Sequence, residues 1–410
     1  MRSIELFTGA GGLALGVHQA GFHHLAVVEW DRDSCDTLRL NGARRAETDV
    51  DWHVIEGDAR AVNYAEFPSG IDLLAGGAPC QPFSLGGKHA GEADRRNMFP
   101  EVFRAVRELR PRAFLLENVK GLTRATFRPY FDYIVEQLEF PHLRQLPGEG
   151  WEEHKARLAA YKAAGERVSG PPWSQDPGLR YDVERKVFDV ADFGVPQRRH
   201  RVFIVGFRHD LGVTWEFPER THSEDALLYA QYVDGSYWRE HGLPQPPVPP
   251  KLERRVRELA DGPKPPLKRW RTVRDAIRDL PEPVDFQPHP AYDNHSGIPD
   301  ARPYPGHTGS PWDWPAKAIK AGDHGNPGGE NMLRRDDGSV RYFTVRELAR
   351  LQTFPDEWHF AGPWTESRRQ LGNAVPVGMA RTLARQIHAA LERARQLSFE
   401  ESRSMIVAAG

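Results

Sequence analysis

The chain has 410 residues, of which 39% are hydrophobic and 27% charged, and its formal net charge is −2. This composition is typical of a soluble globular protein, and the length favours one large and one smaller domain. No apolar run reaches the roughly 18 residues of a membrane-spanning helix, and the first residues lack a signal-peptide pattern. The net charge excludes a uniformly basic nucleic-acid binder but not a local basic surface.

Only two cysteines are present, Cys35 and Cys80. They cannot form a disulfide framework, and they fall short of a structural zinc site of the usual spacing. We therefore expect a cytoplasmic protein that binds neither a metal nor a membrane.

The first 215 residues alternate short apolar runs with helix-like stretches. Strands are predicted at residues 3–7, 25–30, 54–58, 71–76, 113–118 and 202–207. A helix is predicted at residues 98–109, because apolar side chains there share one helical face. Strands separated by helices indicate an α/β fold with a doubly wound, mostly parallel, Rossmann-like sheet over residues 1–215. Such sheets bind ligands at the loops that follow the carboxyl ends of their strands.

Three other segments differ in composition and hydrophobic periodicity from the predicted sheet. Residues 141–180 look like an inserted helix and loop within the first domain. Residues 216–365 are rich in proline and tryptophan and have no helical or alternating period, which predicts a second, smaller, loop-rich domain. Residues 366–400 resume a helical period and are expected to pack back on the first domain.

A glycine-rich turn follows the first predicted strand. Gly9, Gly11 and Ala14 fit the pattern G-x-G-x-x-G/A, in which glycines let a ligand approach the backbone closely. Glu29 ends the next strand, where a carboxylate can accept hydrogen bonds from ribose hydroxyls. Asp58 ends the third strand and could bind an adenine amino group, although an isolated aspartate there is more often a helix N-cap. These positions favour a nucleoside-containing cofactor over an empty turn, and they do not distinguish a nicotinamide from S-adenosylmethionine.

The stretch GGAPCQPFSLGG, residues 76–87, surrounds Cys80 with prolines and glycines just after the fourth strand. An isolated cysteine is usually a buried packing residue, and we interpret Cys35 in that way. The loop position of Cys80 at the ligand end of the sheet instead favours a nucleophile, whose activation would need a nearby cation or a helix N-terminus.

Polar groups also flank the last two predicted strands of this domain. Glu117 and Asn118 end a buried strand, where a carboxyl group tends toward a raised pKa that suits general acid catalysis. A capping or salt-bridged glutamate is the structural alternative. Arg199 and Arg201 precede an apolar strand and, two residues apart, are expected on one face of an extended segment, where they suit phosphate or carboxylate binding.

The motifs FTGAGG, EWD, GD, PCQPFS, ENV, QRRHR, RELARLQTFPD and GNAVP occur in the order found in the DNA (cytosine-5)-methyltransferases. The chain resembles this family over nearly its whole length, apart from residues 141–180 and the variable middle of the second domain. The resemblance implies S-adenosylmethionine as cofactor and double-stranded DNA as substrate. It also implies methylation at C5 of a flipped-out cytosine, through a covalent bond from a cysteine to C6.

Transferred position by position, the resemblance assigns three sets of residues. The catalytic set is Cys80, Glu117, Arg199 and Arg201. The cofactor set is Phe7, Gly9, Gly11, Gly12, Glu29, Trp30, Asp58, Ala59, Pro79 and Asn373. The DNA-contacting set is Gln81, Ser84, Gln197 and Lys320, with residues 81–97 as a mobile loop that closes over DNA.

The region between Arg201 and Arg341 corresponds to the family's target-recognition domain. Residues 251–280 carry ten Lys/Arg and five Asp/Glu, so this stretch could follow a phosphate backbone unless its charges are solvated helix faces. A loop around Lys320 combines glycine, histidine, asparagine and lysine, as reading of base edges would need.

Other functions explain fewer of these residues. A nicotinamide oxidoreductase accounts for the glycine turn and Glu29 but not for Cys80, Glu117 and the arginines together. A zinc-dependent cytosine deaminase needs P-C-x-x-C, and Phe83 occupies the place of its second cysteine. The related tRNA methyltransferases carry a Cys-Phe-Thr motif that is absent here. The resemblance favours a stand-alone bacterial enzyme, expected to be monomeric, with a restriction enzyme or other phage-defence proteins as functional partners.

Overall fold

The structure is a computed structural model that describes residues 1–44, 46, 49–79, 97–164, 178–305, 308–322 and 331–409. The chain divides into two compact units. Unit 1 comprises Met1–Phe188, His200–Phe217 and Ala380–Gly410, and unit 2 comprises Asp189–Arg199 and Pro218–Met379. Residues 189–199 thus group with unit 2, and the return to unit 1 begins at residue 380. In the described part of the chain, no helix has both the length and the apolar character needed to cross a membrane.

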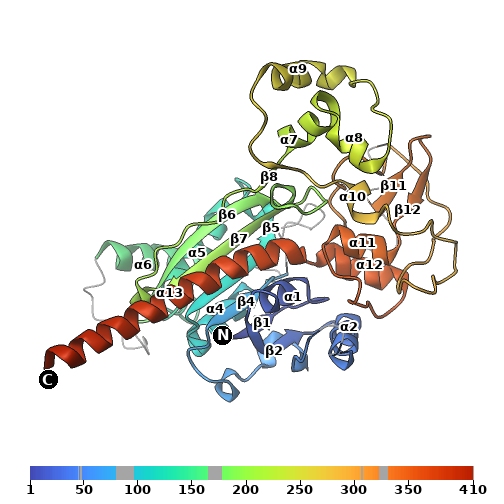
Figure 1. The fold of residues 1–410 in the computed structure, drawn as a ribbon. Helices are drawn as coiled ribbons and strands as arrows, with labels where there is room; N and C mark the ends of the chain where they lie inside the picture. Colours follow the sequence, from blue (N-terminus) through green and yellow to red (C-terminus); the bar gives the residue numbers. More distant parts are fainter. Residues whose placement is uncertain are drawn as a thin grey trace. The chain divides into compact units, whose positions relative to one another are not determined.

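Unit 1 contains a seven-stranded sheet with the strand order β3-β2-β1-β4-β5-β7-β6 (Figure 1). The strands from β1 to β5 are parallel, and β7 runs antiparallel to β5. This arrangement confirms the predicted doubly wound α/β fold. The strands are β1 (Arg2–Leu6), β2 (His23–Glu29), β3 (Val54–Glu56), β4 (Leu73–Gly76), β5 (Ala113–Val119), β6 (Tyr181–Asp189) and β7 (His200–Arg208).

The six predicted strands are all present, and β6 is the strand that the sequence reading missed. Its sequence, YDVERKVFD, is dominated by polar residues, most of them wholly or partly exposed. An edge strand with a solvated surface lacks the apolar run by which buried strands are recognised.

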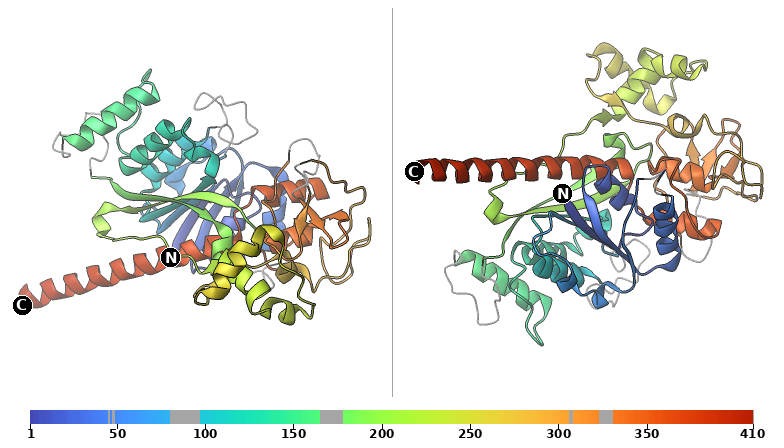
Figure 2. Two further views of the ribbon diagram at one scale, coloured as in Figure 1. Left: turned by 90° about the horizontal axis from the view of Figure 1, so that it is seen from above. Right: turned by 60° about the horizontal axis from the view of Figure 1, so that its bottom comes forward.

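Helices cover both faces of the sheet in unit 1 (Figures 1 and 2). One face packs against α4 (Phe99–Leu109) and α5 (Arg128–Glu139) in a single apolar core, which includes the predicted α4 residues Phe99, Val102, Phe103 and Val106. The other face carries α1 (Gly12–His18) and the unit 1 part of α13 (Val377–Ala409), whose His388 ring lies 5.2 Å from the ring of Phe22. The helix α2 (Arg32–Ala43) follows β2.

The order of the strands places a topological switch between β1 and β4. From β1 the chain continues to β2 and β3 on one side, whereas β4 and β5 lie on the other side. Ligands bind such sheets in the crevice at the carboxyl ends of the two strands that flank the switch. Residues 7–12, after β1, and residues 77–79, after β4, are therefore the segments to inspect.

The insertion forms the predicted helix, α6 (Trp151–Ala163), which packs on α5. His154 is fully buried: its ring nitrogens lie 3.1 Å from the hydroxyl of Tyr133 and 3.0 Å from the carbonyl of Leu143. Burial lowers the pKa of His154 to about 4. The helix is therefore anchored by buried side chains. The rest of the predicted insertion includes residues 165–177, which lie outside the described residues.

Unit 2 consists of short helices and short strands joined by long loops. Its helices are α7 (Glu224–Leu228), a π-helical turn (Tyr229–Val233), α8 (Ser236–His241), α9 (Glu253–Asp261), α10 (Val273–Ile277), α11 (Val345–Leu351) and α12 (Trp364–Asn373). Its short strands are β8 (His222–Ser223), β9 (Lys268–Arg269), β10 (Ser310–Pro311), β11 (Met332–Arg334) and β12 (Val340–Tyr342). Most of these helices span two turns or less, which is too short for a hydrophobic period to show in the sequence.

Candidate active site

The glycine turn after β1 is built from residues with positive φ. Phe7, Gly9 and Gly11 have φ values of 57°, 56° and 88°. A non-glycine residue in this region costs roughly 1–2 kcal/mol, and such strain is concentrated at functional sites. A Cβ placed on Gly9 would meet no atom within 4 Å, so there is open space above this backbone. The turn therefore offers room for a ligand to approach its peptide groups.

Glu29, at the end of β2, holds this turn in place. Its carboxylate accepts hydrogen bonds from the backbone N–H groups of Gly9 at 2.7 Å and of Trp30 and Asp31 at 2.9 Å. Burial raises the pKa of Glu29, and these backbone N–H groups oppose that rise. A carboxylate has about four acceptor positions, of which these contacts use three. The remaining capacity suits one ribose hydroxyl.

Two further predicted cofactor residues lie at the ends of neighbouring strands. The side chain of Trp30 is 75% exposed, so its ring is not part of the core. Asp58 caps a short 3-10 helix (Ala59–Ala61) by accepting a hydrogen bond from the N–H of Arg60 at 2.9 Å. Asp58 is thus a helix N-cap, the alternative role that the sequence left open. Its half-exposed carboxylate lies on the same edge of the sheet as Glu29. Ala59 is buried, and its carbonyl accepts a hydrogen bond from Arg104.

Glu117 and Arg201 form an ion pair between β5 and β7. The Arg201 Nε atom lies 2.7 Å from Glu117 Oε1, and the two side chains are 14% and 9% exposed. Arg201 is paired with Val119 across the antiparallel ladder, so Glu117 is its diagonal neighbour on the same face. A Cβ on Gly77 would lie 3.4 Å from the other Glu117 oxygen. The carboxyl group is therefore held between an arginine and the segment that leaves β4.

Arg199 has different partners from Arg201. It precedes β7 and belongs to unit 2, where its guanidinium donates to the carbonyls of Ile319 at 2.8 Å and Gly372 at 2.5 Å. Its side chain is almost fully buried. The expected arrangement of two arginines acting together on one face is not what these contacts show, because Arg199 ties the backbone at Ile319 to the last turn of α12 within unit 2.

Gln197 is also an interior residue of unit 2. Its amide nitrogen lies 3.4 Å from the Leu351 carbonyl and 3.3 Å from Gln352 Oε1, and its oxygen accepts from the N–H of Ile319 at 3.1 Å. A DNA contact by this side chain would require these hydrogen bonds to open. Gln197 therefore first serves the fold of unit 2.

The other predicted site residues are distributed between the units. Asn373 ends α12 in unit 2. The backbone of Lys320, an exposed residue of unit 2, is bracketed by the side chain of Asn331, with hydrogen bonds of 3.2 and 3.1 Å. Pro79 is the last described residue after β4. Cys80, Gln81, Ser84 and nearly all of the predicted mobile loop at 81–97 lie outside the described residues.

Four basic residues of the stretch 251–280 form ion pairs within unit 2. Arg255, Lys264 and Arg274 form ion pairs with acidic residues outside the stretch, and Arg269 pairs with Asp275. Hence part of the positive charge that suggested a phosphate-binding track is paired within this unit.

Two buried side chains of the sheet, Asn118 and Glu5, were not among the predicted site residues. Asn118 donates a hydrogen bond to the carbonyl of Ala78, just before Cys80. Glu5 is a fully buried carboxyl group on β1, and burial raises its pKa well above the ordinary value. A charged residue inside an apolar strand was the sequence signal for Glu5. Cys35 is confirmed as a buried packing residue, and burial raises its thiol pKa to about 12.

One cluster of potential metal ligands occurs among the described residues, at Glu240, His241 and Asp275. Asp275 already forms an ion pair with Arg269 and caps α10 through Thr272. His241 bridges Asp275 and Arg278. These side chains therefore have partners within the protein.

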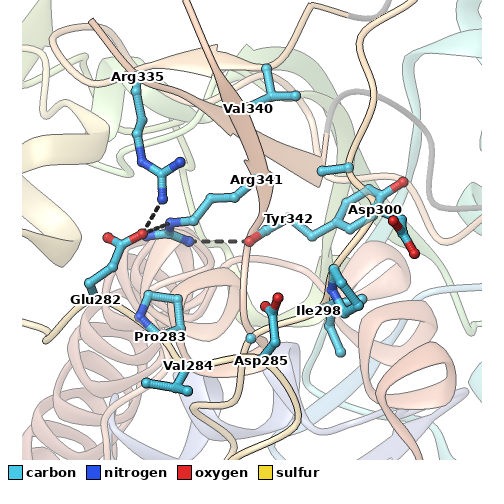
Figure 3. Close-up of a pocket in the computed structure, with 13 residues that line it drawn as sticks. Glu282, Pro283, Val284, Asp285, Ile298, Asp300, Arg335, Val340, Arg341 and Tyr342 are labelled. Atoms are coloured by element: carbon cyan, nitrogen blue, oxygen red, sulfur yellow. Dashed lines mark hydrogen bonds and ion pairs between the residues drawn. The ribbon is translucent and has the colours of Figure 1, made fainter. Parts of the chain in front are cut away.

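Unit 2 also contains a cavity of about 520 Å³ (Figure 3). Arg335 and Arg341 both point toward Glu282 at one end, while Asp285 and Asp300 lie further along the wall. Pro283, Val284 and Ile298 supply apolar surface. None of the predicted site residues that the structure describes lines this cavity.

Comparison with known proteins identifies relatives along the whole chain. The family model described as C-5 cytosine-specific DNA methylase matches residues 1–141 and 175–389 and omits most of the predicted insertion. The Type II methyltransferase M.NgoMIV of Neisseria gonorrhoeae is 32% identical over 398 residues, which cover 95% of this chain and 98% of the relative. The Type II methyltransferase M.Eco47II of Escherichia coli is 32% identical over 387 residues, with 92% and 76% covered.

The fold has counterparts among solved structures as well. The S. pombe Dnmt2 methyltransferase superposes with a TM-score of 0.53 at 14% sequence identity, over 96% of this chain and 99% of that one. At this identity the likeness concerns the fold alone. Together with the family match over both units, the strand order and the strand-end residues lead to one conclusion: the chain belongs to the C-5 cytosine-specific DNA methylase family.

Proposed function

We propose that this enzyme transfers a methyl group from S-adenosylmethionine to C5 of a flipped-out cytosine in duplex DNA, within one recognised sequence. The observation that carries the proposal is the Glu117–Arg201 ion pair, which lies against the segment leading from β4 to Cys80. A carboxyl group held by an arginine suits a pyrimidine, whose N3 and exocyclic groups need hydrogen bonds as charge develops on the ring.

The described residues of unit 1 fit the cofactor. Gly9 lies under open space, the Glu29 carboxylate has capacity for one ribose hydroxyl, and the Trp30 ring is exposed for stacking on adenine. Phe7, Gly11 and Gly12 would line the methionine part, while Asp58, Ala59, Pro79 and Asn373 would complete the site. When bound, S-adenosylmethionine supplies an electrophilic methyl group on its sulfonium.

The residues of this chain would divide the chemistry between them. The Cys80 thiolate would add to C6 of the cytosine, which breaks the aromaticity of the ring and makes C5 nucleophilic. Glu117 would hold a proton at N3, and Arg201 would keep the Glu117 carboxyl in place. C5 would bond to the methyl carbon as the methyl–sulfur bond of the sulfonium breaks, with S-adenosylhomocysteine as the leaving group. Transfer of the C5 proton to a base would then expel the Cys80 thiolate and release 5-methylcytosine.

Two parts of the wider proposal concern the partners. The relatives are named Type II methyltransferases, which supports a role in restriction-modification beside a restriction enzyme of the same specificity, or in related phage defence. Gln81, Ser84 and Lys320 are proposed to contact DNA. Arg199 and Gln197 would act indirectly, by holding the loops of unit 2.

Bisulfite sequencing of DNA from a methylation-free host that expresses the chain would test the proposal, with Cys80→Ala as control. Protected cytosines in one recurring sequence, absent with the Cys80→Ala variant, are the expected result. Unprotected DNA from cells that contain folded protein able to bind S-adenosylmethionine would overturn DNA as the substrate. Substantial protection by Cys80→Ala would overturn the assignment of the nucleophile.

A further inference from the structure

Two successive residues of unit 2, Ile319 and Lys320, have their backbone polar groups bonded to buried side chains. Gln197 accepts a hydrogen bond from the N–H of Ile319 at 3.1 Å, and Arg199 donates to the Ile319 carbonyl at 2.8 Å. Asn331 bonds Lys320 at both ends: its Oδ1 accepts from the Lys320 N–H at 3.2 Å, and its Nδ2 donates to the Lys320 carbonyl at 3.1 Å. Gln197, Arg199 and Asn331 are each at most 1% exposed. Side chains therefore fix four backbone groups in a row, as the ladder of a sheet would fix them.

Asn331 is itself fixed by the small sheet of unit 2. It directly precedes β11, and its backbone carbonyl accepts a hydrogen bond at 3.0 Å from the N–H of Phe343, directly after β12. In that sheet β11 lies between β10 and β12. The amide of Asn331 has one useful orientation, because only its nitrogen can donate and only its oxygen can accept. Asn331 therefore connects the backbone of Lys320 to the sheet.

The last turn of α12 packs against the same backbone. A Cβ placed on Gly372 would overlap the nitrogen and Cα atoms of Ala321 and the carbonyl carbon of Lys320. Because glycine has no Cβ, it lets the two backbones approach this closely. A shift of the Lys320 backbone would therefore disturb its contacts with both Asn331 and α12.

Lys320 is an exposed residue on this fixed backbone. The ammonium group of a lysine can donate hydrogen bonds to O6 and N7 of guanine in the major groove, and it can also pair with a phosphate. A phosphate contact carries no sequence information, whereas a contact with one base edge requires the backbone behind the side chain to be held in place. We infer that Asn331 is a positioning residue for target recognition, which holds the backbone of Lys320 so that its ammonium group contacts one guanine of the recognised sequence.

This inference rests on the proposed function and is tested with the full chain. Asn331→Ala removes both bonds to Lys320, whereas Asn331→Asp keeps the acceptor for its N–H but loses the donor to its carbonyl. Asn294→Asp is the matched control, because Asn294 brackets Phe360 in the same unit, with hydrogen bonds of 3.0 Å to its N–H and 3.1 Å to its carbonyl. Lys320→Ala and the double variant Lys320→Ala with Asn331→Ala complete the set.

The substrates are duplexes that contain the recognised sequence, with each guanine replaced in turn by 7-deazaguanine, which lacks the N7 acceptor. The readout is the ratio of kcat/KM for methyl transfer to the unmodified duplex and to each replaced duplex. For the wild type, one replacement should give a ratio of about 5 to 100. Lys320→Ala and both Asn331 variants should bring this ratio toward 1 at the same guanine. The double variant should lose no more than Lys320→Ala alone, because the two residues act on one contact.

Asn294→Asp should lose thermal stability and keep the wild-type ratio. The wild-type ratio in a folded Asn331 variant, or a loss of the ratio that Asn294→Asp shares, would overturn the inference. An unchanged ratio in Lys320→Ala would overturn it too, and this variant of an exposed residue should fold even where the Asn331 variants do not. Ratios near 1 for every guanine in an active wild type would have the same meaning, as expected of a phosphate contact. Absence of methyl transfer by the wild type would instead count against the proposed function, so the two failures are distinguishable.

Discussion

Replacing Glu117 by glutamine removes a charge from the ion pair with Arg201 while the shape of the side chain is kept. The two side chains are 9% and 14% exposed, and their atoms lie 2.7 Å apart. Unit charges about 4 Å apart attract each other by about 4 kcal/mol at an effective dielectric constant of about 20. Glutamine still accepts the Arg201 hydrogen bond, and a neutral amide avoids part of the cost of burying a carboxylate.

The expected net loss of stability for Glu117→Gln is therefore about 1–3 kcal/mol. Because a domain is typically stable by about 5–15 kcal/mol, the variant should remain folded at room temperature. Catalysis should suffer more, since a glutamine cannot hold a proton for N3 of the base. Loss of a general acid typically costs about 100- to 10,000-fold in rate.

The assay is single-turnover transfer of a tritiated methyl group to unmethylated duplex DNA, together with urea unfolding and the affinity for S-adenosylmethionine. Glu149→Gln is the matched control, because Glu149 forms a similar pair with Arg157 at 2.8 Å in the insertion. It should lose stability with little loss of rate. Transfer by Glu117→Gln within threefold of the wild type, or an equal loss in Glu149→Gln, would refute the reasoning.

Four other substitutions or conditions give distinct expectations. Burial raises the pKa of Glu5, so above about pH 4.5 the unfolded chain releases this proton while the folded chain keeps it. The stability of the wild type therefore falls as the pH rises above that value. Glu5→Gln should remove this decline, so its Tm should exceed that of the wild type by more at pH 8 than at pH 5. Burial lowers the pKa of His24 to about 4, so the folded chain keeps this ring neutral at pH values where the unfolded chain protonates it. The resulting stabilisation, up to about 3 kcal/mol, should be lost as the pH falls from about 6.5 to 4. Urea titrations would measure this loss, and an unfolding midpoint that does not depend on pH would contradict it. Trp30→Ala should change the unfolding free energy by less than about 0.5 kcal/mol, because its ring is exposed, yet weaken S-adenosylmethionine binding about 5- to 100-fold in calorimetry. Gly206→Ala should destabilise unit 1 by about 1–3 kcal/mol in denaturant unfolding, since the new Cβ would overlap the ring of Phe114.

The sequence predicted most of the catalytic unit because its signals are local. The six predicted strands are apolar runs between turn residues, and the α4 helix shows its apolar face over eleven residues. Cys35 was recognised as a packing residue from its setting alone. The edge strand β6 and the short helices of unit 2 were missed, because polar edges and single helical turns leave no period to detect.

The sequence by itself determined the family, the α/β class and which strand ends carry polar groups, since motif order and hydrophobic period are properties of the chain. Only the tertiary structure decided which of those groups meet. It paired Glu117 with Arg201 and not with Arg199, because the antiparallel register of β5 and β7 makes Arg201 the diagonal neighbour. It also gave Asn118 a partner in Ala78, because strands whose paired residues are 40 positions apart in the chain lie side by side in the sheet, and no local pattern records such a contact.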